Sequence, residues 1–208
     1  MAAERAGADR VELCVALDEG GTTPPAELIA DVVRRLRIPV FVLVRPRTGA
    51  FIYSDAEIDI MIRSIEKAAA MGAAGVVSGV LTSDRRIDVE RTRTLWKSAE
   101  ALPMTFHRAF DAVLEPLDAL ERLIDLGVSR VLTSGAAETA LEGADAIATL
   151  RERARKRIGI VAGGGVRKHN VSEVIARTGV SEVHGRLVDE PSMRALVGIA
   201  HRGTNRSG

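Results

Sequence analysis

The sequence predicts an α/β fold, a TIM-like (β/α) barrel formed by a single domain over residues 1–200. Three observations support this fold class. Short apolar strands alternate with amphipathic helices along the whole chain, the strands are of two kinds that recur in turn, and 208 residues suit one barrel with one core. A doubly wound parallel sheet is the alternative, and the recurrence of two strand kinds favours the barrel.

Strands of the first kind follow a helix-ending glycine and a tight turn. The four copies are GADRVEL from Gly7, GAAGVVS from Gly72, GVSRVLT from Gly127 and GVSEVHG from Gly179. Strands of the second kind occur three times, as IPVFVLVR from Ile38, LPMTFHR from Leu102 and RIGIVAGG from Arg157. A fourfold pattern therefore lacks one strand, which would precede the helix-like start of the chain. We expect a barrel without its first strand, completed by residues encoded upstream of Met1 or covered by a partner chain.

Amphipathic segments between the strands predict the helices. These segments are Ala26–Leu36, Ala56–Met71, Val89–Ala99, Leu117–Leu126, Asp145–Ala154 and Val171–Arg177. Ser54 and Glu57 have the spacing of a capping box at the start of the second of them. The last residues, 201–208, read HRGTNRSG and predict a frayed tail.

Composition excludes several classes of protein. The formal net charge of +1, with one Trp and one Tyr, provides neither a basic surface for a phosphate backbone nor a platform for stacking bases. No apolar run reaches membrane-spanning length, and the start lacks the pattern of a signal peptide. A single Cys excludes an intramolecular disulfide. We expect a cytoplasmic protein that binds neither nucleic acid nor membrane.

Polar side chains gather where the predicted strands end, which is where a parallel barrel builds its site. Alternation along RVELC places Glu12 and Cys14 toward the barrel interior, and FVLVRPR places Arg45 and Arg47 on the same face as Phe41. The fourth predicted strand ends in TFHRAFD, with His107, Arg108 and Asp111, and the sixth ends in AGGGV.

Three of these residues are hypothetical catalytic residues: Glu12, His107 and Asp111. Glu12 is a carboxylate in the predicted interior, although it and Arg45 have the alternative of a buried structural ion pair. His107 has Asp111 four residues later as a possible orienting partner, and the alternative is a core histidine with satisfied hydrogen bonds. His184, in the last predicted strand, has the same two interpretations, a functional histidine or a core histidine with satisfied hydrogen bonds.

Six residues are candidates for binding an anion: Arg45, Arg47, Arg108, Gly163, Gly164 and Gly165. Arginine side chains form charge-assisted hydrogen bonds with phosphate or carboxylate, and the glycine-rich turn before a helix offers backbone N–H groups. The alternatives are that the arginines neutralise the barrel rim and that the glycines serve close packing.

Cys14 is the one candidate metal ligand, because thiolate sulfur suits Cu(I). A two-coordinate thiolate site needs a second sulfur, and no zinc spacing such as CxxC or HExxH occurs. The alternative is that Cys14 fills space as a small apolar side chain.

Several blocks together resemble the CutC copper homeostasis protein family: ADRVELC, EGGTTP, VLVRPRTGAFIYSDAEI, TFHRAFD, RVLTSG and IVAGGGV, in this order from Arg5 to about His184. The resemblance implies a TIM-like barrel, a cytoplasmic homo-oligomer, Cu(I) binding and a first strand of the type EVCV. In family members proposed to bind copper, that strand carries one cysteine and the next strand another. Cys14 matches only the second.

Three functional hypotheses follow. The first is a cytosolic copper homeostasis protein of the CutC type that binds Cu(I) weakly through Cys14. The second is a barrel enzyme in which Arg45, Arg47 and Arg108 hold a small phosphate or carboxylate substrate while His107 or Glu12 transfers a proton. The third is an inactive remnant without its first strand.

Overall fold

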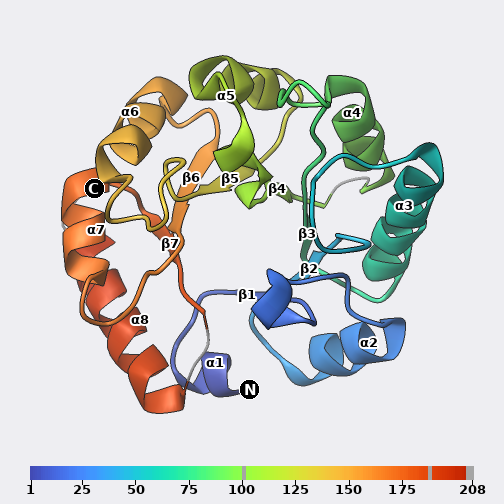
Figure 1. Cartoon of the computed structure of the whole chain (residues 1–208). Helices are drawn as coiled ribbons and strands as arrows, with labels where there is room; N and C mark the ends of the chain where they lie inside the picture. The colour runs from blue at the N-terminus through green and yellow to red at the C-terminus, as the bar shows by residue number, and fades with distance from the viewer. Residues whose placement is uncertain (100–101, 187–188, 205–208) are drawn as a thin grey trace.

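The fold is a barrel of seven parallel strands that is open on one side. The computed structural model describes residues 1–99, 102–186 and 189–204. Each strand pairs with its neighbours in chain order, from β1 to β7, so β1 and β7 are the two edges of the sheet. Figure 1 shows the sheet curled at the centre with the helices as a ring outside it. The predicted α/β barrel, lacking one strand, is confirmed.

The seven predicted strands are all present. Their bounds are β1 Val11–Leu13, β2 Val40–Leu43, β3 Gly75–Ser78, β4 Met104–Phe106, β5 Arg130–Thr133, β6 Gly159–Gly163 and β7 Glu182–His184. The α-helices are α1 Ala2–Arg5, α2 Ala26–Arg35, α3 Asp55–Ala70, α4 Val89–Ser98, α5 Pro116–Asp125, α6 Ala144–Ala154, α7 Val171–Thr178 and α8 Glu190–Thr204. Two short 3-10 helices, η1 Leu17–Glu19 and η2 Arg108–Ala112, follow β1 and β4.

The helices agree with the amphipathic segments, with one addition. Ser54 and Glu57 form the predicted capping box at the start of α3. Helix α8 was not predicted, and it includes residues 201–204 of the expected tail, whereas 205–208 lie outside the described residues. Figure 1 shows α8 beside α1 and α7. No helix among the described residues is long and apolar enough to cross a membrane.

Alternation along the strands separates the barrel interior from the helix-facing layer, as predicted. Phe41 and Leu43 form an interior cluster with Val77 and Cys14, whereas Val42 between them packs with Leu13 under the helices. Gly75 on β3 makes room for the Phe41 ring, because a Cβ there would lie 2.5 Å from a ring carbon. Packing inside the barrel therefore requires a glycine at position 75, because the Phe41 ring occupies the space that a side chain would need.

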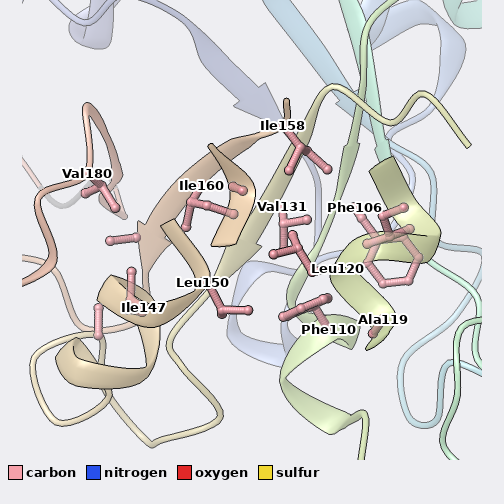
Figure 2. Packing of buried hydrophobic residues seen from close by; sticks show 14 of the residues in the cluster. Phe106, Phe110, Ala119, Leu120, Val131, Ile147, Leu150, Ile158, Ile160 and Val180 are labelled. Carbon is pink, nitrogen blue, oxygen red and sulfur yellow. The ribbon is translucent and has the colours of Figure 1, made fainter. Parts of the chain in front are cut away.

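The largest apolar cluster lies between strands β4 to β6 and helices α5 to α7. Figure 2 shows Phe106, Leu120 and Val131 meeting in it, and all three are fully buried. At roughly 1.5 to 3 kcal/mol for each buried aliphatic or aromatic side chain, this layer is the main stabilising feature of the fold.

The open side of the barrel, which we call the seam, is bridged by side chains. No strand ladder joins β1 to β7 in the described part of the chain. Arg10 Nη1 instead lies 2.6 Å from Glu182 Oε2, and Glu12 Oε2 lies 3.3 Å from His184 Nδ1. An ion pair and a contact between the Glu12 carboxylate and the His184 ring thus take the place of backbone pairing between these two edges.

Candidate functional site at the barrel mouth

The predicted polar residues lie at the carboxyl ends of the strands, where the loops form the barrel mouth. They come from β1, from the segments after β2 and β4, and from the end of β6. The structure divides them into a group at the seam, a group under the loop of residues 46–53, and a group beside the loop after β6.

Glu12 faces the seam and does not pair with Arg45. Its Oε2 lies 3.3 Å from His184 Nδ1, and its side chain is 11 % exposed. Its other oxygen, Oε1, is buried and has no hydrogen-bond partner among the described residues. The alternative of a structural Glu12–Arg45 ion pair is therefore wrong, because β7 supplies the partner, and Glu12 retains an unused acceptor.

Arg45 is buried and ties two loops together. Its Nη1 donates to Gly21 O at 3.0 Å and its Nη2 donates to Gly49 O at 3.0 Å. Its guanidinium lies 4.9 Å from the centroid of the Phe51 ring. Nε is buried without a partner among the described residues, so one donor is left beside Phe51.

Arg47 points to the start of α3. Its Nε donates to Glu57 Oε1 at 2.6 Å and its Nη2 to Ile52 O at 2.7 Å. The guanidinium also lies over the Tyr53 ring. Arg47 itself belongs to the loop of residues 46–53, which we call the strap, and its hydrogen bonds join this loop internally and to Glu57 on α3.

His107 is buried under the strap. Its Nδ1 accepts a hydrogen bond from the N–H of Ala109 at 3.2 Å, and its ring centroid is 4.9 Å from that of Phe51. Burial, with the positive charge of Arg45 as a second cause, lowers the pKa of His107 to about 3. Nε2 is buried and has no hydrogen-bond partner among the described residues. The ring is therefore neutral at pH 7.

Asp111 accepts hydrogen bonds from the segment after β5 and from Arg108 rather than from His107. Its carboxylate accepts from Ser134 N at 3.0 Å, from Arg108 Nε at 2.7 Å and from the Thr133 hydroxyl. Several donors at one carboxylate fix it in place. Asp111 is thus placed to position Arg108, and no hydrogen bond between Asp111 and His107 occurs among the described residues.

Arg108 lies beside the glycine loop that follows β6. Its Nη2 donates to Ser134 Oγ at 2.8 Å. A Cβ at Gly164 would lie 3.0 Å from Ser134 Cβ and 3.4 Å from the Arg108 guanidinium, and Gly164 has a φ of +105°. Gly163 is buried at the end of β6, whereas Gly165 is exposed. An exposed guanidinium and a backbone without side chains therefore share one small surface.

Cys14 is half-buried after β1, with its sulfur against Gly21. Burial, followed by the negative charge of Glu12, raises the pKa of its thiol. Met61 and Met104 pack in the helix-facing layer, so their sulfur atoms cannot act as metal ligands at the barrel mouth. Among the described residues, no three His, Cys, Asp or Glu side chains gather to hold a metal ion. The donor set for Cu(I) is thus a single sulfur, which fits weak binding at most.

The sequence did not predict three contacts of this site. These are the Glu12–His184 pair, the carbonyls bound by Arg45, and the cover that Phe51 forms over His107. Glu12 lies within β1 and His184 ends β7, so their positions on the first and last strands were the one signal available. Contacts of a loop such as the strap have no periodic pattern in sequence.

The family model and the similar proteins of known sequence all point to one family. The model of the CutC family matches residues 1–188. The human protein named copper homeostasis protein cutC homolog is 48% identical over 182 residues, which cover 88% of this chain and 67% of that protein. A family protein CutC from Xanthomonas axonopodis pv. citri is 46% identical over 184 residues, covering 88% and 77%.

Solved structures agree on the fold. A CutC crystal structure from Streptococcus agalactiae superposes with a TM-score of 0.83 at 37% identity, covering 87% of this chain and 90% of that one. An aldolase designated QR15 superposes with a TM-score of 0.66 at 15% identity, covering 99% and 86%. The second likeness concerns the fold alone.

Proposed function

Because the chain belongs to the CutC family, we propose that it takes part in copper homeostasis in the cytoplasm and binds Cu(I) at Cys14. The names of its relatives support the copper role. The observation that carries the site is the position of the only cysteine, half-buried at the barrel mouth. Homo-oligomers belong to the same proposal.

The affinity for Cu(I) is modest and rises with pH. The sulfur must lose its proton to bind well, and burial together with Glu12 disfavours the thiolate. A single sulfur also leaves the second position of the ion to a weaker donor.

A competition titration with a Cu(I) chelator tests this function. We expect the parent chain to bind Cu(I) at Cys14, Cys14→Ser to abolish binding, and Met104→Leu to leave it unchanged, because Met104 is buried away from the mouth. Unchanged binding by Cys14→Ser would show that this residue does not carry a copper role.

A second candidate function is the binding and turnover of a small anionic substrate at the same mouth. The observation that favours it is that three of the six buried side-chain polar atoms without partners among the described residues belong to predicted site residues: Glu12 Oε1, Arg45 Nε and His107 Nε2. Buried polar groups are nearly always hydrogen-bonded, so unpaired ones at a barrel mouth favour a ligand that completes them. Arg108 and the loop Gly163 to Gly165 supply the anion-binding part.

The anion-binding part is tested with a matched pair of arginine variants. The Arg47 and Arg108 side chains are 43% and 44% exposed, and each pairs with a carboxylate. We expect inorganic phosphate to raise the melting temperature of the parent and of Arg47→Ala, and to affect Arg108→Ala at about tenfold higher concentration, as the loss of one charge-assisted hydrogen bond implies. Equal responses of the two variants would remove Arg108 from the site.

A further inference from the structure

His107 differs from a histidine that acts as a base. Its Nδ1 accepts the N–H of Ala109 in the first turn of η2, so a neutral ring carries its proton on Nε2. That N–H is buried and unpaired among the described residues, and the residue is 6% exposed. The ring therefore presents a hydrogen-bond donor, and its one acceptor is already used.

The surroundings of His107 contain a second unpaired donor. His107 and Arg45 both lie against the Phe51 ring, at 4.9 Å in each case, and Arg45 Nε is also buried without a partner among the described residues. Each of these residues therefore keeps a buried donor beside the Phe51 ring, and a buried donor without a partner favours an oxygen that accepts a hydrogen bond. Arg108, which follows His107 in the chain, lies on the side of the glycine loop.

We propose that His107 is a neutral hydrogen-bond donor that binds a carbonyl or carboxylate oxygen of a small phosphate-bearing substrate through Nε2–H, and that it transfers no proton as a base. The proposal rests on the second candidate function, with Arg108 and Gly164 at the phosphate. A neutral imidazole held by a backbone N–H at Nδ1 polarises a carbonyl in this way in triosephosphate isomerase. The role differs from the proton-transfer role expected from the sequence.

Access to His107 requires displacement of the strap. Phe51 lies over the ring, and the strap is held by Arg45 at Gly49 O and, through Arg47, by Glu57 near the start of α3. The first of these bonds is half-buried and the second is exposed, so water can replace both. A substrate oxygen that reaches the Nε2–H would take the place of the Phe51 contact.

The protonation state is tested first, by ¹⁵N NMR of the histidine rings in the whole chain between pH 5 and pH 8. We expect one ring to remain neutral with its proton on Nε2 throughout, and its signals to be missing from His107→Gln. A His107 ring that gains a proton within this range, or carries its proton on Nδ1, overturns the proposal without touching anion binding.

Binding is tested with 2-phosphoglycolate, which has a phosphate and a carboxylate oxygen, against inorganic phosphate. We expect the parent to prefer 2-phosphoglycolate, and His107→Asn, which keeps an acceptor near Nδ1 but lacks the Nε2 donor, to lose about tenfold of that preference. His107→Gln, which carries an amide N–H near the Nε2 position, should retain most of it. Phosphate affinity should be the same in all three chains.

The outcomes separate the two levels of the proposal. An unchanged preference in His107→Asn, or equal binding of both anions by the parent, overturns the role of His107 while anion binding stands. Binding of neither anion by the parent overturns the second candidate function, and the role of His107 with it. A His107→Asn chain that does not fold is replaced by His107→Gln, which must then keep the preference.

Discussion

Strands β4 to β6 and the edge strands β1 and β7 belong to one sheet but are stabilised differently. All three residues of β4 are buried, whereas no residue of β1 or β7 is fully buried. The first region packs apolar side chains under α5 to α7, and the second is joined by ion pairs at the seam. Apolar burial is worth roughly 1.5 to 3 kcal/mol per side chain, and a partly exposed ion pair roughly 0 to 1. We therefore expect the two regions to respond very differently to substitution.

The largest effect is expected in the apolar cluster. Phe106→Ala should lower the free energy of unfolding by about 3 to 5 kcal/mol, because it leaves a cavity where the side chain is fully buried. Urea denaturation followed by circular dichroism measures it. Leu117→Ala, at an exposed position of α5, is the control and should change stability by less than about 0.5 kcal/mol. Similar losses in both variants would contradict the assignment of the core.

The next effect concerns the network around Asp111. Asp111→Ala should cost about 3 kcal/mol, because it leaves Ser134 N and the Thr133 hydroxyl without their acceptor in a half-buried site. Asp118→Ala removes an acidic partner from an exposed ion pair with Arg122 and should cost less than about 1 kcal/mol. Equal losses, again measured by urea denaturation, would show that the network does not stabilise the fold.

The buried His107 should make the folded chain less stable as the pH falls. His107 has a pKa of about 3 in the folded chain, against about 6.5 when unfolded, so the unfolded state binds the proton first as pH falls. Stability is lost below pH 6.5, by about 2 kcal/mol between pH 6.5 and pH 5. His107→Gln should lack this part of the loss. The same pH dependence in that variant would place the cause elsewhere.

The smallest effect is expected at the seam. Arg10→Met should cost less than about 1 kcal/mol, because the pair with Glu182 is partly exposed and Arg130 also contacts Glu182. The loss should shrink further in about 0.5 M salt, which screens exposed charges. A loss comparable to that of Phe106→Ala would mean that the seam is as important to folding as the core.

Much of the fold was predictable because it depends on local and periodic signals. Gly72 and Gly127 end helices before β3 and β5, and the alternation of Phe41, Val42 and Leu43 separates interior from exterior. Helix α8 was missed because it follows the last strand, where the strand repeat gives no further guidance.

The sequence named candidate residues for the site, whose function stays a prediction, but it did not predict which groups they contact. The partners of Arg45, for example, are backbone carbonyls of two loops, which any residue can supply. The His107 hydrogen bond likewise uses a backbone N–H. Because the partner groups are backbone atoms, the amino-acid types at those positions do not reveal these contacts in the sequence.

The neighbour-by-neighbour order of the strands has a consequence for how the chain folds. Each strand from β2 onward pairs with the one made just before it, so the sheet can grow unit by unit as the chain leaves the ribosome. The contact between Arg10 and Glu182 is different, since 172 positions separate the two residues. Closing so long a loop is entropically costly and slow relative to local pairing. The side-chain contacts across the seam are therefore expected to form last, after the strands between them have paired.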